Sequence, residues 1–208
     1  MGADLVGAVI VNFNAGLLLS DAVESLLRQT VLPARIVVVD NKSEEAPILG
    51  SEPWISQVEL LRLEMNVGFA EANNRAVALM DDCEWIALLN PDARAQPQWL
   101  EALLDAAIRN PQFEFFASKM RKADMPDRLD GAGDHFCPSG WAYARGKDLE
   151  AGFFSLEEEV FSPCAGAALY RRGAFLDAGG FDPDFFCYME DIDLGFRLRL
   201  LGYRCLYV

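Results

Sequence analysis

Basic side chains are scarce in this chain of 208 residues, which has 18 lysine and arginine residues against 32 aspartate and glutamate residues, and one histidine. The formal net charge of -14 argues against nucleic acid as a main partner, because binding a phosphate backbone requires a basic surface. It does not exclude a small phosphate-bearing ligand, whose charge a metal ion or backbone amides can offset.

The sequence also shows no paired cysteine spacing and no apolar run long enough to cross a membrane. The five cysteines are scattered and form no C-x-x-C spacing, which favours a reducing cytoplasm over a disulfide framework or a zinc site. The apolar run Leu5–Val11 has no basic segment before it and is far too short to cross a bilayer. With 52% hydrophobic residues, the chain can bury a substantial core and is most simply one domain.

Short apolar runs rich in β-branched residues alternate with helical patterns through the first half of the chain. Strands are predicted over Leu5–Val11, Ile36–Val39, Val58–Leu63, Trp85–Leu89 and Phe113–Ala117, and helices over Leu17–Arg28, Ala70–Met80 and Trp99–Arg109. This alternation is typical of an α/β fold with a mostly parallel central sheet flanked by helices. Residues 120–160 are rich in glycine and proline, which predicts loops or irregular hairpins before a further strand over Ala167–Arg171.

The segment 192–200 supports two interpretations. Apolar and polar residues alternate with a period of two, as in a strand. The acidic start, the spacing of four between Asp193 and Arg197, the late arginines and Gly202 are helix signals. The pattern alone leaves the two open.

Polar residues collect where the predicted parallel strands end, and in such sheets ligands bind outside the carboxyl ends. These clusters are Asn12 with Asn14, Asp40-Asn41-Lys42-Ser43, Asn66-Val67-Gly68-Phe69 with Asn73 and Asn74, and Asn90-Pro91-Asp92. A single cluster is explained by turn chemistry, but four on one edge indicate a binding site. Asp40 can accept hydrogen bonds from a nucleobase or ribose, Gly68 permits close backbone approach, and Asp92 offers an oxygen ligand to Mg²⁺ or Mn²⁺.

A second acidic feature is the pair Glu190-Asp191, which follows the aromatic run Phe185-Phe186-Cys187-Tyr188. Aromatic surroundings can raise the proton affinity of a carboxylate, which suits a general base. The alternative is that the two acidic residues only favour a helix start.

Five ordered segments carry a resemblance to glycosyltransferase family 2, the inverting nucleotide-sugar enzymes with a GT-A fold. They are VIVNFN at 9–14, VVVDNKS at 37–43, NVGFAEANN at 66–74, LLNPDA at 88–93 and GGFDPDFFCYMEDIDLGFRLRLLGY at 179–203. The NVGFA, NPD and FFCYMEDIDL forms are most similar to the rhamnosyltransferase-like branch.

The resemblance implies a role for each candidate residue. Asp191 would be the catalytic base, with Glu190 beside it, and Asp92 would bind Mg²⁺ or Mn²⁺. The nucleotide would be bound by Asn12, Asp40, Asn66, Gly68, Asn74 and Asn90. The resemblance also implies a helix from Asp191 onward, and a single GT-A domain over 1–208 with a nucleotide-binding half (1–118) and an acceptor-side half (119–208).

Two departures from the family pattern stand out. Asn90 occupies the first position of the DxD-type motif, which removes one carboxylate. The family's further metal-binding histidine would follow the strand near Tyr203, and the chain stops at Val208, so we expect a chain cut short at its C-terminus. His135 lies in the irregular region and is interpreted as a surface or structural residue.

The implied activity is inverting transfer of a sugar, rhamnose in this branch, from a dTDP- or UDP-linked donor to a glycan or lipid-linked acceptor. Such a protein would be cytoplasmic and peripheral at the inner face of the cell membrane. The alternatives are a sugar-nucleotide pyrophosphorylase, disfavoured because NFNAGLLL after the first strand has no basic residue, and a nucleotide-binding module without turnover. The sequence does not fix the donor, the acceptor, the linkage or the oligomeric state.

Overall fold

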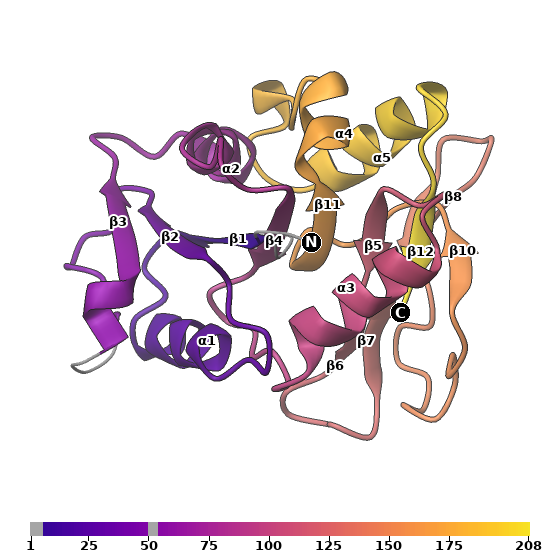
Figure 1. Cartoon of the computed structure of the whole chain (residues 1–208), viewed down its shortest axis with the longest axis horizontal. Helices are drawn as coiled ribbons and strands as arrows, with labels where there is room; N and C mark the ends of the chain where they lie inside the picture. The colour runs from indigo at the N-terminus through magenta and orange to yellow at the C-terminus, as the bar shows by residue number, and fades with distance from the viewer. Residues whose placement is uncertain (1–5, 50–53) are drawn as a thin grey trace.

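The structure, a computed structural model, describes residues 6–49 and 54–208. Within these residues a central eight-stranded sheet crosses the molecule, with helices α1 and α3 on one face and α2, α4 and α5 on the other (Figure 1). This arrangement confirms the predicted α/β fold with a mostly parallel sheet flanked by helices. Within the same residues, no helix combines the length and the apolar character needed to span a bilayer.

The elements match the predicted ones closely, with ends that shift by one or two residues. The helices are α1 Leu17–Leu27, α2 Gly68–Ala78, α3 Trp99–Arg109, α4 Arg172–Asp177 and α5 Glu190–Leu200, with 3-10 turns η1 Trp54–Gln57 and η2 Pro183–Phe185. The strands of the main sheet are β1 Val6–Asn12, β2 Arg35–Asp40, β3 Val58–Arg62, β4 Trp85–Leu89, β5 Phe115–Ala117, β10 Glu158–Val160, β11 Ala167–Arg171 and β12 Cys205–Tyr207. Leu5, which begins the predicted first strand, lies outside the described residues.

The strand order in the main sheet is β10-β12-β5-β11-β4-β1-β2-β3. Strands β1 to β4 are mutually parallel, and β12 is parallel to β5. Strand β11 lies between β4 and β5 and is antiparallel to both. The alternation of strands and helices in the first half does not predict this insertion, because β11 belongs to the part of the chain after the irregular region.

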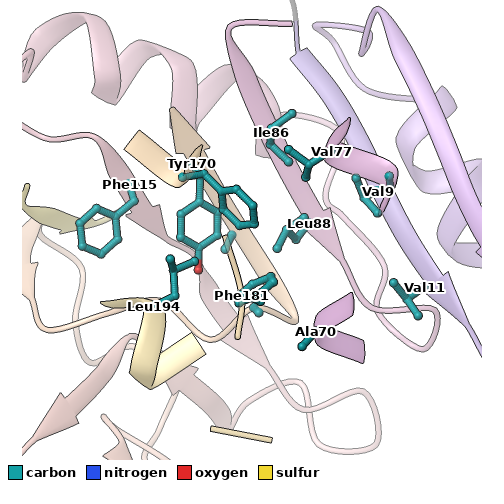
Figure 2. Packing of buried hydrophobic residues seen from close by; sticks show 14 of the residues in the cluster. Val9, Val11, Ala70, Val77, Ile86, Leu88, Phe115, Tyr170, Phe181 and Leu194 are labelled. Atoms are coloured by element: carbon teal, nitrogen blue, oxygen red, sulfur yellow. The ribbon is translucent and has the colours of Figure 1, made fainter. Parts of the chain in front are cut away.

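The period of two along each strand divides the core between the two faces of the sheet. Val9 and Val11 of β1 face the side of α2, α4 and α5, whereas Ala8 and Ile10 face α1 and α3. Figure 2 shows Val9 and Val11 in the first of these cores, with side chains of α2 beside them. Burial on both faces explains why β1, β2 and β4 are almost continuously apolar.

An aromatic cluster fills the first core beneath the start of α5. The ring of Tyr170 on β11 stacks on Phe115 with centroids 6.1 Å apart, and it meets Phe181 edge-on at 6.4 Å. Phe175 contacts Phe181 edge-to-face at 5.3 Å. Figure 2 shows Leu194 of α5 beside this group. The cluster therefore supports both the segment before α5 and the helix itself.

The irregular region forms short hairpins, as predicted, and folds back on the main sheet. Its pairs are β6 Lys119–Arg121 with β7 Leu129–Ala132, and β8 Asp134–Phe136 with β9 Ala142–Ala144. Arg145 is buried in this region, with 5% of its surface exposed. Its guanidinium lies 4.0 Å from the ring centroid of Phe154 and forms an ion pair with Glu158. These two contacts join the end of β9 to Phe154 and to β10, so Arg145 connects three segments of the region.

The ambiguous segment 192–200 is helical, within α5. Ile192, Leu194 and Leu198 are buried, and Asp193 forms an ion pair with Arg197 at 2.6 Å. Apolar residues lie on several sides of the helix because it packs against the sheet, α4 and the segment before β11, so its sequence has no single apolar face. The helix signals, with the resemblance, predicted this segment correctly, and the alternation was misleading.

Candidate functional site

The carboxyl ends of β1 to β4 meet at one edge of the sheet, and the predicted polar clusters lie along it. The strand register pairs Asn12 with Asp40, and Asp40 with Arg62. Strand β11 runs the other way, so the segment that precedes it also reaches this edge, where Ala167 pairs with Leu89. In spatial order the edge carries Arg62, Asp40, Asn12, Asn90 and the segment 162–166.

Asp40 is a buried carboxylate near one end of this edge. Its side chain is fully buried, and its Oδ1 accepts hydrogen bonds from Asn12 Nδ2 at 3.0 Å and from the backbone N–H of Ser43 at 3.3 Å. Asn12 Nδ2 also donates to Ser43 Oγ at 3.0 Å. Asn12 and Ser43 therefore fix the orientation of the Asp40 carboxylate through its Oδ1 atom.

The other oxygen of Asp40 faces Arg62. Arg62 Nε lies 3.1 Å from Asp40 Oδ2, an ion pair without hydrogen-bond geometry, so Oδ2 is left without a hydrogen-bond donor in the part of the chain that the structure describes. The Arg62 side chain is 52% exposed. A buried carboxylate oxygen next to an accessible guanidinium offers one acceptor and several donors to a ligand.

Asn41 ties the loop 66–68 to the end of β2. Its Nδ2 donates to Asn66 Oδ1 at 2.9 Å and to the carbonyl of Gly68 at 3.1 Å, and its Oδ1 accepts from the backbone N–H of Val67 at 2.9 Å. Asn66 Oδ1 also accepts from the backbone N–H of Gly68 at 2.9 Å. These bonds hold the loop against the edge of the sheet, directly before α2.

Gly68 permits a close backbone approach, and in the structure the approaching group is Phe186. Gly68 has a φ of 84°, and a Cβ atom at this position would collide with the carbonyl of Phe186. That carbonyl accepts the backbone N–H groups of Phe69 at 2.6 Å and Ala70 at 3.2 Å. The first turn of α2 is thus joined to the segment that leads to Asp191. A nucleotide contact at Gly68 stays a prediction.

Asn74 joins α2 to the same segment from the next turn. Its Nδ2 donates to the carbonyl of Phe181 at 2.7 Å, and its Oδ1 accepts from the backbone N–H of Phe181 at 2.9 Å. Its predicted contact with a nucleotide is not tested by this geometry. The observed bonds fix the position from which the chain enters the segment 182–189, where every residue is exposed.

Asn90 and Asp92 lie in the turn after β4. The backbone N–H of Asn90 donates to the carbonyl of Gly166 at 2.9 Å, which joins this turn to the segment before β11. Asp92 is exposed, and its carboxylate forms no hydrogen bond or ion pair with another described residue.

One free carboxylate at the strand end fits a Mg²⁺ or Mn²⁺ ion held together with substrate phosphates. Residues 6–49 and 54–208 contain no group of three or more His, Cys, Asp or Glu side chains placed to hold a metal ion without a substrate.

Asp191 lies at the start of α5 and faces the segment before β11. Its Oδ2 accepts the backbone N–H of Ala165 at 3.0 Å, and its Oδ1 accepts the backbone N–H of Ile192 at 2.8 Å. Burial raises the pKa of Asp191 above its ordinary value, while these two backbone N–H groups oppose the rise. The carboxylate is therefore held in one orientation with an enhanced proton affinity.

Glu190, Asp134 and Cys164 are titratable groups near Asp191. Burial, with a smaller contribution from the charge of Asp191, raises the pKa of Glu190 to about 7 and that of Asp134 on β8 to about 7. Burial and the same charge raise the pKa of the Cys164 thiol to about 12. Glu190 Oε2 has no hydrogen-bond partner among the described residues. The base candidate thus lies in acidic, poorly solvated surroundings.

These raised pKa values predict how stability depends on pH. The folded protein binds more protons than the unfolded chain between about pH 4 and pH 7, so the free energy of unfolding falls as pH rises through that range. Asp134→Asn should flatten this slope and stabilise the protein at pH 8 by about 1 to 4 kcal/mol. Urea unfolding at pH 4.5, 6 and 8 measures it, and an unchanged slope in the variant would contradict the assignment.

The structure brings Asn12, Asp40, Asn66, Gly68 and Asn90 to one edge. Asp191 joins this edge through Ala165, and Asp92 lies in the turn beside Asn90. Sequence reasoning assigned no role to Arg62, Ser43, Asn41 and Asp134. Ser43 and Asn41 stood in a noted cluster, but only the register of β2 with β3 shows that Arg62 meets Asp40.

The family match identifies the class of this protein as a glycosyltransferase, and the fold is of the GT-A type. The chain belongs to glycosyl transferase family 2, whose model matches residues 8–178.

Among curated proteins, the chain is 30% identical to the N-acetylglucosaminyl-diphospho-decaprenol L-rhamnosyltransferase of Mycobacterium tuberculosis, over 99% of this chain and 74% of that protein. It is 29% identical to the glucosyl-dolichyl phosphate glucuronosyltransferase of Haloferax volcanii, over 78% of this chain and 50% of that protein.

Solved structures show the same fold. GalNAc-T7, crystallised with UDP, GalNAc and Mn²⁺, superposes with a TM-score of 0.80 at 16% identity over 100% of this chain and 43% of that one. Staphylococcus aureus TarS residues 1–349, in complex with UDP, gives a TM-score of 0.74 at 16% identity over 98% of this chain and 57% of that one. The chain therefore spans less than two thirds of either solved chain. These matches confirm the expected GT-A fold.

Proposed function

We propose that this protein transfers a sugar, with inversion, from a nucleoside-diphosphate donor to a hydroxyl of a lipid-linked glycan acceptor. The observation that carries the proposal is the order of groups along the sheet edge. Asp40 stands near one end and Asp191 beyond the other, with Asn12 and Asn90 between them. The strands β3 and β11 are four spacings apart, about 19 Å, which leaves room for nucleoside, diphosphate and sugar in line.

Asp191 is the proposed base. Its carboxylate would take the proton of the acceptor hydroxyl as that oxygen attacks the anomeric carbon from the face opposite the diphosphate. The backbone N–H groups of Ala165 and Ile192 hold the carboxylate in position, and burial gives it the raised proton affinity that a general base needs. No second carboxylate is required as a nucleophile, so the product would have the inverted configuration.

Asp92 would hold Mg²⁺ or Mn²⁺ together with the donor phosphates, and Asn90, in the same turn, would contact the nucleotide. When bound, such an ion neutralises charge that develops on the leaving diphosphate. The free, exposed carboxylate of Asp92 supports this assignment. Because the protein has a net charge of -14, a cation would reduce the repulsion between it and an anionic donor. At the other end, Asp40 would accept a hydrogen bond from the nucleoside.

Rhamnose, carried by dTDP or UDP, is the proposed sugar, because the M. tuberculosis relative named for rhamnosyl transfer is 30% identical along almost the whole chain. The same relative acts on a diphospho-decaprenol lipid, and the H. volcanii relative on a dolichyl phosphate. A lipid-linked acceptor would place the work of this enzyme at a membrane surface, peripherally and on the cytoplasmic side.

A screen of nucleotide sugars with a GlcNAc-diphospho-lipid acceptor, with Mn²⁺ or with EDTA, tests the proposal. We expect product from dTDP-rhamnose that depends on the metal. Asp92→Asn should lose most of the metal-dependent gain in nucleotide affinity, whereas Asp105→Asn, exposed on α3, should keep it. Nucleotide binding without product would indicate a binding module, and product from a sugar phosphate and a nucleoside triphosphate a pyrophosphorylase. Either result would overturn the proposal.

A further inference from the structure

The exposed ring of Tyr188 carries an inference that rests on the proposed function and deepens it. Tyr188 lies three positions before Asp191 and is 83% exposed, and its side chain forms no hydrogen bond, ion pair or ring contact with another described residue. We propose that Tyr188 is a specificity-determining residue for the acceptor, whose sugar stacks on the tyrosine ring while one of its hydroxyls reaches Asp191. Small-molecule sites are typically lined by aromatic side chains beside a few polar groups.

The backbone around Tyr188 has a conformation that residues with side chains rarely adopt. The φ angles of Phe186, Tyr188 and Met189 are 59°, 74° and 72°, all in the left-handed region that favours glycine. For bulky residues this conformation is strained, and it persists only where the surrounding structure imposes it. Such strain is concentrated at ligand-binding and active sites. The strained segment here leads directly into α5, the helix that carries Asp191.

Hydrogen bonds to α2 and α5 impose this conformation on the segment. The carbonyl of Phe186 accepts two backbone N–H groups from the first turn of α2, at 2.6 and 3.2 Å. The carbonyl of Met189 accepts the backbone N–H of Asp193 in the first turn of α5, at 3.0 Å. Tyr188 lies between these two attachments, so its backbone is fixed while its ring has no partner among the described residues. The exposed ring is therefore held beside the start of the helix that carries Asp191, and is not folded onto the core.

The chemistry of the segment favours a neutral ligand with an apolar face. Residues 185–189 include no charged side chain and lie between Asp184 and Asp191, whose negative charges disfavour a phosphate beside Tyr188. A sugar ring is neutral, and its C–H groups carry a partial positive charge that complements the negative face of an aromatic ring. The acceptor sugar also carries the attacking hydroxyl, so it must come within reach of Asp191. The lipid chain is attached beyond the diphosphate, so the sugar is the occupant that this position fits.

The test compares two reactions of one donor with the whole chain, with Mn²⁺ present. One is transfer from dTDP-rhamnose to a GlcNAc-diphospho-octyl acceptor, and the other is hydrolysis of dTDP-rhamnose, in which water takes the place of the acceptor. Tyr188→Ala should lower kcat/KM for the acceptor by roughly 5- to 50-fold, the range that loss of one aromatic stacking contact gives. It should leave the rate of hydrolysis unchanged, because no donor contact is lost. Tyr188→Phe keeps the aromatic face and should transfer at close to the wild-type rate.

The matched control is Phe153→Ala, which removes another exposed aromatic ring. Phe153 belongs to the segment that the Arg109–Glu157 ion pair joins to α3, on the sheet face opposite α5 (Figure 1), so both reactions should stay unchanged.

Three results would overturn the inference while wild-type transfer still supports the proposed function. They are unchanged transfer by Tyr188→Ala, equal losses of transfer and hydrolysis, and a loss that appears only with a polyprenyl acceptor, which would place the ring against the lipid. A folded wild-type protein that neither hydrolyses nor transfers any nucleotide sugar would overturn the proposed function as well.

Discussion

Replacing Asp191 with asparagine is expected to lower kcat by roughly 10²- to 10⁴-fold, the contribution that a positioned general base makes. The amide keeps the size of the side chain and can still accept the backbone N–H of Ala165 through its oxygen. It cannot take a proton from the acceptor hydroxyl. The affinity for a nucleoside diphosphate should stay within about twofold, because Asp40, at the nucleoside end of the site, lies on β2, three strand spacings from β11.

The matched control for this variant is Asp193→Asn on the same helix. Asp193 pairs with Arg197 at 2.6 Å within α5, so its loss should cost about 0.2 to 0.5 kcal/mol of stability and leave turnover unchanged. Steady-state rates and nucleotide titrations on both variants provide the comparison. Near-normal turnover in Asp191→Asn, with nucleotide still bound, would remove Asp191 from the role of base.

The second large effect concerns stability. Phe181→Ala should lower the free energy of unfolding by about 3 to 5 kcal/mol, the usual cost of emptying an aromatic core position. Phe181 is 1% exposed and lies among Phe69, Tyr170 and Phe175, with ring centroids between 5.3 and 6.4 Å from its own. The surrounding rings belong to α2, β11 and α4, and such a site collapses poorly around a cavity.

Urea unfolding of Phe181→Ala measures this loss, and Phe153→Ala is the control. Phe153 is 54% exposed, so its truncation should change the free energy of unfolding by less than about 0.5 kcal/mol. A loss at Phe181 no larger than that at Phe153 would mean that the aromatic cluster does not support the segment before α5.

The sequence predicted the sheet edge because its local signals agreed with the fold. Strands β1, β2 and β4 are buried on both faces and read as apolar runs, and Asn12, Asp40 and Asn90 follow them directly. The five motif segments fixed the family. The helix from 190 onward was recovered only with the resemblance, because a helix buried on several sides has no simple apolar face.

Other parts of the site depend on contacts that the sequence does not encode locally. The carbonyl of Phe186 and the backbone N–H of Ala165 are main-chain groups, which every residue type has, so the residue types at these positions do not predict their contacts. Arg62 meets Asp40 through strand register, and Asp134 reaches the surroundings of Asp191 through a hairpin in the glycine-rich region. Long-range pairing of this kind follows from topology, which here includes the insertion of β11.

The central claim is that Asp191 acts as a base in an inverting transfer at this edge. Its most direct test is the anomeric configuration of the product, read by NMR after the protein has used a dTDP- or UDP-linked sugar with a lipid-linked acceptor. We expect a linkage of configuration opposite to that of the donor, formed roughly 10²- to 10⁴-fold more slowly with Asp191→Asn. A product that retains the configuration of the donor would contradict it.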